Sequence, residues 1–153
     1  MSNPEAWLRQ ALELARANVQ KGGRPFGAVL VKDGKVVATA VNEIHVTNDP
    51  TSHAELNAIR KACAVLGSPR LDGCSVYASG QPCPMCHAAM YLTGISSYAY
   101  AYSNEEGAPF GLSTADIASE MASPLEDQSI RTRHIPVRLA DGKHLYELWK
   151  KSS

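Results

Sequence analysis

Four residues in two short segments have the side chains and spacing to bind a metal and activate water. The segments are His53-Ala54-Glu55 and Pro82-Cys83-Pro84-Met85-Cys86. One imidazole and two thiolates suit Zn²⁺, and three protein ligands leave a fourth position for water, as in catalytic zinc sites. Glu55 lies two residues after the histidine, where its carboxylate can move protons on that water. The sequence therefore predicts a zinc centre with His53, Cys83 and Cys86 as ligands and Glu55 as the catalytic residue.

Four other interpretations of these segments remain open. Ser52 to Glu55 also has the S-x-x-E pattern of a capping box, in which Glu55 would only close a helix start. Cys83 and Cys86 have the spacing of a redox dithiol, and with His87 they match the C-x-x-C-H haem-attachment pattern. A structural zinc site would need a fourth protein ligand, for which the candidates are Cys74, His45, His87 and His134.

Both segments are predicted to lie at the start of a helix that follows a loop. The first helix is expected over 52–66 and the second over 84–93, with Cys83 as the cap of the second. Residues i and i+2 point to different sides of a helix body, so His53 and Glu55 can share a target only from a first turn. Unpaired N–H groups at a helix start also lower the pKa of a thiol, which favours the thiolate ligand.

The rest of the chain has the pattern of an α/β domain. Apolar residues recur at helical spacing between Asn3-Pro4 and Gly22-Gly23, and a turn signal at 32–35 separates two short apolar runs. Strands that alternate with helices after an initial hairpin predict a three-layer α/β/α fold with a mixed central sheet, as a single domain over residues 1–153. We expect strands at 26–31, 36–41, 75–79, 95–102 and 135–139, helices at 113–121 and 144–151, and loops at 42–51 and 103–112.

The composition narrows the range of partners. Lys and Arg total 15 and are balanced by 15 Asp and Glu, whereas a nucleic-acid-binding surface usually shows a basic surplus. No apolar run approaches the roughly 18 residues of a membrane-spanning helix, and no export signal is recognisable. We therefore expect a cytoplasmic protein with no membrane contact and no stable nucleic-acid binding. In a reducing compartment the cysteines are expected as thiolate ligands and, at Cys63 and Cys74, as buried thiols.

Several segments resemble the cytidine and deoxycytidylate deaminase superfamily, and within it the bacterial guanine deaminase branch. The resemblance implies a cytidine deaminase-like fold, zinc bound by the one histidine and two cysteines, and Glu55 as the proton shuttle. It also implies that Asn42 and Phe26 hold and sandwich a base, and that the protein is a homodimer. The similar segments are Gly27-Ala28-Val29, Asn48-Asp49-Pro50-Thr51, His53-Ala54-Glu55, residues 58–63 and residues 82–86.

The chain departs from that family pattern in three places. Gln81 precedes the Pro-Cys segment, where relatives usually carry glutamate. Guanine-handling relatives place an acidic residue in the loop after the last core strand, and the candidates here are Glu105, Glu106 and Asp116. The C-terminal tail, which closes the pocket in relatives, has little similarity to theirs.

The leading functional hypothesis is hydrolytic deamination of a free base, with guanine converted to xanthine and ammonia. Within enzymes, the alternatives are tRNA adenosine deamination and deamination of cytosine or another amino-heterocycle such as a triazine. The non-enzymatic alternative is a zinc-stabilised binding module. Ammonia release separates these classes, because a binding module keeps its zinc and releases none.

Overall fold

The structure, a computed structural model, describes residues 3–152. The chain separates into two compact units, the first ending at Ser119 and the second beginning at Glu120. Each unit is described by itself below. In the described range, no helix combines the length and apolar character needed to cross a lipid bilayer.

The first unit begins with helix α1 (Pro4–Gln20). Its start is capped by Asn3, whose side-chain oxygen accepts a hydrogen bond from the amide of Ala6, as the Asn-Pro pair predicts. The helix lies directly against the first strand. A Cβ atom at Gly27 would lie 2.5 Å from the carbonyl oxygen of Ala11, so only glycine permits this close approach.

A β-hairpin follows, formed by β1 (Gly27–Lys32) and β2 (Lys35–Val41). Asp33 and Gly34 connect the two strands and both have positive φ angles, which is typical of a type I′ hairpin turn. The polar stretch after β2 was expected to be loop throughout, but it contains one short helix, α2 (Ile44–Thr47).

Helices and strands then alternate along the chain. The order is α3 (Ala54–Leu66), β3 (Cys74–Gly80), α4 (Pro84–Thr93) and β4 (Ser97–Tyr102). The four strands form one sheet in the order β2-β1-β3-β4. β1 is antiparallel to both of its neighbours, whereas β3 and β4 are parallel. This arrangement confirms the predicted mixed sheet.

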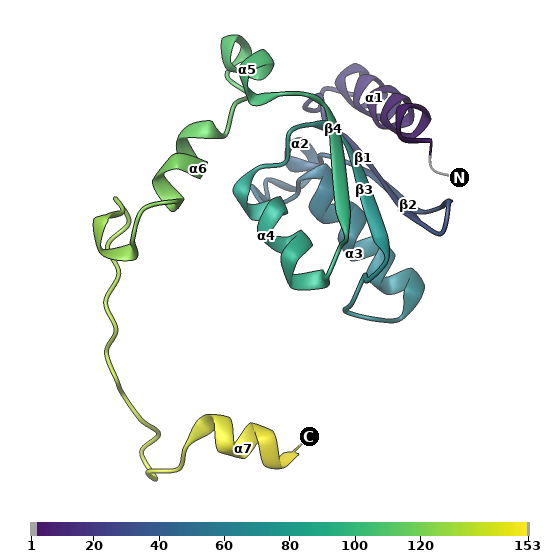
Figure 1. The fold of residues 1–153 in the computed structure, drawn as a ribbon. Coiled ribbons are helices and arrows are strands. Elements are labelled where there is room, and N and C mark those ends of the chain that lie inside the picture. The colour runs from purple at the N-terminus through teal and green to yellow at the C-terminus, as the bar shows by residue number, and fades with distance from the viewer. Residues whose placement is uncertain (1–2, 153) are drawn as a thin grey trace. The chain divides into compact units, whose positions relative to one another are not determined.

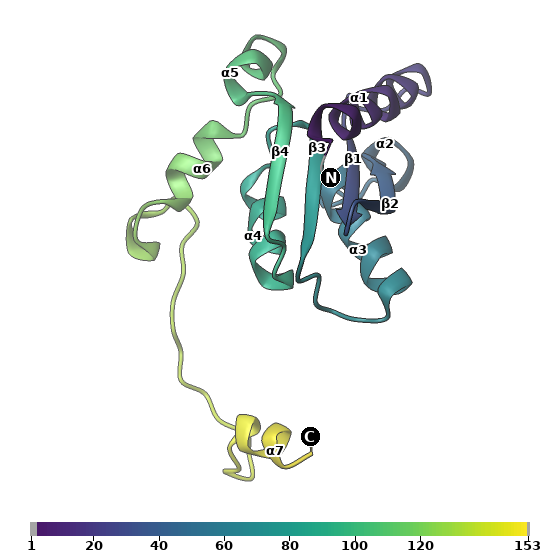
Figure 2. The same ribbon diagram turned by 45° about the vertical axis from the view of Figure 1, so that its right-hand side comes forward.

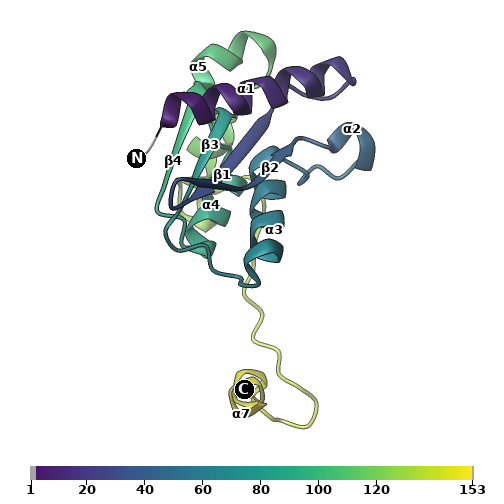
Figure 3. The same cartoon turned by 90° about the vertical axis from the view of Figure 1, so that its right-hand side faces the viewer.

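Helices cover both faces of the sheet, as the three-layer prediction requires (Figures 1 and 2). Alternate residues of β1 point to opposite faces. Val29 and Val31 pack with Tyr77 against α1, while Ala28 and Leu30 belong to the cluster that contains the buried residues of α3. Figure 3 shows the hairpin between α1 and α3. The layers thereby fix where the starts of α3 and α4 lie relative to the strand ends.

The segment after β4 was expected to be loop over 103–112. Instead it contains the one-turn helix α5 (Asn104–Gly107) and the 3-10 helix η1 (Ala108–Phe110). Ser103 and Glu106 form a capping box at the start of α5, which gives this short helix its stability. Helix α6 (Ala115–Met121) then follows, close to its predicted bounds.

The second unit has little regular structure. It contains the 3-10 helix η2 (Leu125–Asp127) and helix α7 (Leu145–Ser152), the latter as predicted. The strand expected at 135–139 is wrong, because this stretch pairs with no other strand in the described residues. A strand is stable only when its backbone groups find a partner. The apolar side chains Ile135 and Val137 are 58% and 75% exposed.

Candidate metal and active site

Two helix starts converge on one point. His53 is the N-cap of α3 and Cys83 is the N-cap of α4, and both have extended backbone angles. Neither side chain caps its own helix, so both remain available to a ligand. The capping-box interpretation of Ser52 and Glu55 is wrong, because the helix begins at Ala54 and the Ser52 hydroxyl instead accepts a hydrogen bond from the Asn57 side chain.

The three predicted metal donors lie close together. Nδ1 of His53 lies 3.4 Å from Sγ of Cys83 and 3.7 Å from Sγ of Cys86, and all three donor atoms lie within 4.8 Å of one another. Tetrahedral zinc with ordinary Zn–N and Zn–S bonds places such donors about 3.6 Å apart. The donor set therefore fits Zn²⁺.

The described residues supply no fourth protein ligand. None of the four candidates for a structural site belongs to the donor group, which consists of one histidine and two cysteines. A set of three protein ligands is typical of catalytic zinc, in which water takes the remaining position. The structural-zinc alternative needs a fourth protein ligand from Cys74, His45, His87 or His134. None of these residues belongs to the donor group, so that alternative lacks its ligand.

Hydrogen bonds among the donors shift their acid–base properties. Cys86 donates to Cys83, which lowers the pKa of Cys83 to about 4 and raises the pKa of Cys86. The hydrogen bond with Cys83 also raises the pKa of His53. One thiolate is thus stabilised next to a second thiol and an imidazole. Zinc binding requires both thiolates and so releases the remaining thiol proton.

Glu55 lies beside this donor group without belonging to it. Its side chain is buried, with 7% exposure, and interacts with the Cys86 thiol. Burial raises the pKa of the Glu55 carboxyl above its ordinary value. A carboxyl group with a raised pKa can both accept and return a proton near neutral pH. This is the property that a proton shuttle needs.

A cavity of about 130 Å³ opens in front of these groups. Most of the predicted site residues line it, namely His53, Glu55, Cys83, Phe26 and Asn42. Cys86 is fully buried behind them and does not line the cavity. The cavity wall is completed by residues that the sequence analysis did not assign to the site: Arg24, Gln81, Gly111, Leu112, Ser113 and Thr114.

Asn42 is held rigidly in the cavity wall. Its side-chain oxygen accepts a hydrogen bond from the amide of Ile44 at 3.0 Å, and its carbonyl accepts one from Asn18 Nδ2 at 2.9 Å. Within residues 3–152 its own Nδ2 has no protein partner, so this donor is available to a bound molecule. Asn18 is a buried residue of α1. Its hydrogen bond to Asn42 was not predicted, because no local sequence pattern indicates such a contact.

Gln81 ties the far wall of the cavity to the strand that precedes α4. Its side-chain oxygen accepts a hydrogen bond from the amide of Asn104 at 2.9 Å. The Asn104 side-chain oxygen accepts one from the amide of Thr114 at 3.2 Å. Thr114 carries the one buried side-chain oxygen or nitrogen in the described residues that lacks a hydrogen-bond partner, its Oγ1.

The three acidic candidates for base recognition do not reach this cavity. Glu106 accepts hydrogen bonds from the amide and hydroxyl of Ser103, and Glu105 and Asp116 are exposed. In the described residues, Glu55 is the one carboxylate among the side chains that line the cavity. None of the three candidates therefore supplies a carboxylate to the lining of this cavity.

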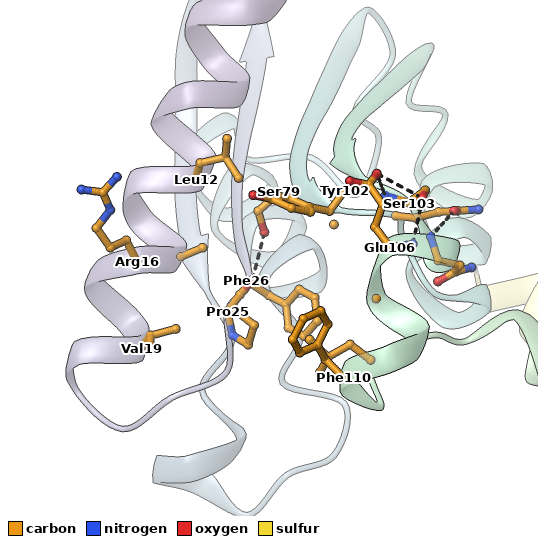
Figure 4. A pocket seen from close by; sticks show the side chains of 16 residues that line it. Leu12, Arg16, Val19, Pro25, Phe26, Ser79, Tyr102, Ser103, Glu106 and Phe110 are labelled. Carbon is orange, nitrogen blue, oxygen red and sulfur yellow. Dashed lines mark hydrogen bonds between the residues drawn. The ribbon is translucent and has the colours of Figure 1, made fainter.

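A larger cavity of about 490 Å³ lies next to the first and shares Phe26, Gln81 and Leu112 with it. Figure 4 shows side chains of α1, including Leu12 and Val19, on one side and those of the segment around Phe110 on the other. Glu106 lies at this cavity, where Ser103 already binds it. His53, Cys83 and Glu55 line the smaller cavity and not the larger one.

Comparison with known proteins agrees with this geometry. Residues 1–102 match the family model of the cytidine and deoxycytidylate deaminase zinc-binding region. Guanine deaminase from Bacillus subtilis is 44% identical over 129 residues, which are 84% of this chain and 83% of that protein. A tRNA-specific adenosine deaminase from Aquifex aeolicus is 38% identical over 97 residues, which are 63% of this chain and 64% of that protein.

Solved structures give the same relationship. An X-ray structure of guanine deaminase from Bacillus subtilis superimposes with a TM-score of 0.87 and 40% identity, covering 98% of this chain and 95% of that one. A guanine deaminase from Nitrosomonas europaea gives a TM-score of 0.70 and 30% identity, covering 74% of this chain and 66% of that one.

Proposed function

Because the chain belongs to the cytidine and deoxycytidylate deaminase family, we propose that it hydrolyses free guanine to xanthine and ammonia. One observation carries the proposal: two of the three metal donors, a buried carboxylate and two base-binding candidates line a single small cavity. The similarity to two bacterial guanine deaminases supports guanine over other amine-bearing bases.

His53, Cys83 and Cys86 are the residues that would hold the zinc ion. Their spacing supports this assignment, as does the mixture of one nitrogen and two sulfur donors. Bound zinc lowers the pKa of its water to about 7, which supplies a nucleophile at neutral pH. The starts of α3 and α4 keep the donors in place, because each helix packs on the sheet through its buried residues.

Glu55 carries the protons in the proposed reaction. It takes a proton from the attacking water and gives it to the ring nitrogen N3 as the water oxygen bonds to C2. It then moves the remaining proton of the new hydroxyl group to the amine nitrogen on C2. The carbon–nitrogen bond then breaks, ammonia leaves, and a carbonyl remains on the ring. The burial of Glu55 supports this role, since burial raises the pKa of the carboxyl and so makes it a better proton acceptor.

Asn42 and Phe26 would hold the base. The unpartnered Nδ2 of Asn42 can donate a hydrogen bond to a ring acceptor, while its other side-chain atom is already fixed by Ile44. The half-buried ring of Phe26 offers an apolar face to the flat heterocycle. Phe26 is positioned by its own backbone, whose carbonyl accepts a hydrogen bond from the amide of Asn42 at 3.1 Å.

Two features support a free base over a base within RNA. The cavity, at about 130 Å³, is smaller than the roughly 300–1,000 Å³ of sites for drug-sized ligands, which suits a single heterocycle. The chain also has equal numbers of acidic and basic residues, whereas an RNA enzyme needs several cations along its phosphate contacts.

We also infer that the whole chain, residues 1–153, acts as one deaminase domain within a homodimer. β4 is an edge strand with Tyr98, Tyr100 and Tyr102 exposed, and Tyr91 and Leu92 of the adjacent helix are each 78% exposed. Such apolar surface next to an open strand edge favours self-association. Sedimentation at micromolar concentration checks this, and a monomer would contradict it.

The cytoplasm is the proposed location and purine metabolism the proposed context. Cys83 and Cys86 have to stay reduced in order to bind zinc, and the four cysteines of the structure are all free thiols. The context of purine metabolism follows from the proposed substrate, guanine, and the proposed product, xanthine.

An ammonia-release panel tests the proposed function. The zinc-loaded protein is assayed with guanine, adenine, cytosine, guanosine and tRNA, and guanine is expected to be turned over fastest with little dependence on salt. Efficient deamination of tRNA with inert free bases would replace the proposal with the tRNA alternative. Bound zinc with no ammonia from any of these substrates would point to a binding module.

A further inference from the structure

The outer wall of the catalytic cavity carries one positive charge. Arg24, in the loop between α1 and β1, lines the same cavity as Glu55, His53 and Cys83. Its charge acts on His53 and opposes the protonated form of that imidazole, which places the guanidinium near the donor group. In the part of the chain that the structure describes, the cavity lining includes no other arginine and no lysine.

The Arg24 side chain is not committed to a partner within the protein. It is exposed, and no ion pair or side-chain hydrogen bond involves it in residues 3–152. Its backbone, by contrast, is fixed: the carbonyl of Arg24 accepts hydrogen bonds from Asn18 Nδ2 and from the amide of Phe26, each at 2.8 Å. The Arg24 guanidinium is thus a cation without a protein partner, on a loop whose backbone is held by hydrogen bonds.

The cavity lining carries one carboxylate and one guanidinium. Glu55 lies beside the metal donors, and the acidic residues of the segment after β4 do not line the cavity. A base bound here therefore meets a carboxylate near the reacting carbon and a guanidinium elsewhere on its edge. Guanidinium groups bind the O6 and N7 acceptors of guanine in a bidentate manner, whereas an amine at position 6 repels them.

The shape of guanine matches this arrangement. When its C2 amine faces Glu55, the O6 and N7 atoms point away from that carboxylate, and Arg24 is the cation in the cavity lining that they can meet. We propose that Arg24 is a specificity-determining residue, whose guanidinium binds the O6/N7 edge and selects bases with a carbonyl at position 6. This inference rests on the proposed function, since it takes the C2 amine as the group that leaves.

The test compares two bases that share the C2 amine and differ at position 6. Guanine carries a carbonyl there and 2,6-diaminopurine carries an amine. Rates are measured for the wild type, Arg24→Gln and Arg24→Lys, and the products are identified by chromatography so that loss of the 2-amine is counted. Arg9→Gln is the matched control, because Arg9 is exposed on α1 away from the cavity.

The wild type is expected to prefer guanine. Arg24→Gln should reduce that preference on the order of tenfold to hundredfold, mainly through a higher KM for guanine, while 2,6-diaminopurine is affected little. Arg24→Lys should restore part of the preference, because lysine supplies charge without a bidentate fork. The melting temperature should stay unchanged in all variants, since the exposed guanidinium has no protein partner.

Binding measurements separate this inference from the proposed function. In the Glu55→Gln background, calorimetric titration gives the affinities of guanine and 2,6-diaminopurine with and without Arg24→Gln. A loss confined to guanine supports Arg24 even if the wild type proves inactive on guanine. Equal losses for both bases, or an unchanged preference, would overturn the inference. So would an effect of Arg24→Gln that appears with an RNA substrate alone, because the guanidinium would then bind a phosphate.

Discussion

The side-chain Nδ2 of Asn18 donates a hydrogen bond to the backbone carbonyl of Asn42 at 2.9 Å, across 24 positions of the chain. The same nitrogen donates to the carbonyl of Arg24 at 2.8 Å. One buried amide on α1 therefore ties together the two loops that carry Arg24, Phe26 and Asn42. The Asn18 amide thus positions the residues proposed to hold the base. In the same way, the starts of α3 and α4 position the metal donors.

Asn18→Ala should destabilise the protein and weaken base binding together. The substitution leaves two carbonyl groups without their donor, which costs about 1–3 kcal/mol for a buried group. The expected result is a lower urea midpoint and a higher KM for guanine, with zinc content unchanged. Gln10→Ala, at an exposed position on the same helix, serves as the control. Equal midpoints for both variants would show that the Asn18 amide does not support the loops.

Cys83→Ala and Cys86→Ala should each abolish zinc binding. The wild type is expected to carry about one zinc per chain, because three donors at tetrahedral spacing make one site. Metal analysis of purified protein checks this, with Cys63→Ala as the control because Cys63 lies outside the donor group. Poor folding of the first two variants would agree with coupled folding and metal binding. Full zinc occupancy in either of them would refute the ligand assignment.

Glu55→Gln should retain zinc and the fold but lose turnover by at least about 100-fold, since the neutral amide cannot take a proton from water. Turnover, zinc content and melting temperature are measured on one preparation. Glu105→Gln is the matched control, because Glu105 is exposed and lies outside the cavity. Activity within a few-fold of the wild type would remove Glu55 from its catalytic role.

Thr114→Val should leave stability unchanged or raise it. The Thr114 hydroxyl is buried without a partner, and replacing an unsatisfied polar group by a methyl group relieves a desolvation cost. Thr93→Val is the comparison, because the Thr93 hydroxyl donates to the carbonyls of Ala89 and Met90. Its loss should lower stability by about 1 kcal/mol. Denaturant curves that show the opposite order would indicate a hidden partner for Thr114.

The metal site was predictable because its information is local. A cap followed by Pro84 fixes the start of α4, so Cys83 and Cys86 fall on its first turn whatever the rest of the fold does. The position of His53 at a helix start was predictable in the same way, although α3 begins at Ala54 and not at Ser52. Layer order and the mixed sheet also followed from the alternation of elements.

The features that were missed depend on contacts between distant segments. Arg24 reaches the cavity because the loop after α1 packs beside Asn42, and no local pattern reports that contact. The strand expected at 135–139 failed for a related reason. Alternating apolar residues specify a face, but a strand forms only where a neighbour offers backbone partners. The sequence also left open which acidic residue, if any, faces the base, and in the structure one of the candidates, Glu106, caps α5 instead.

The placement of His53 and Cys83 at the starts of two helices, 30 residues apart, makes stability depend on the supply of metal. A ligand that binds only the folded chain adds free energy of unfolding in proportion to the logarithm of its free concentration. Each tenfold rise in free zinc above the dissociation constant therefore adds about 1.4 kcal/mol. The same protein would tolerate fewer substitutions in zinc-starved cells, including substitutions far from the site.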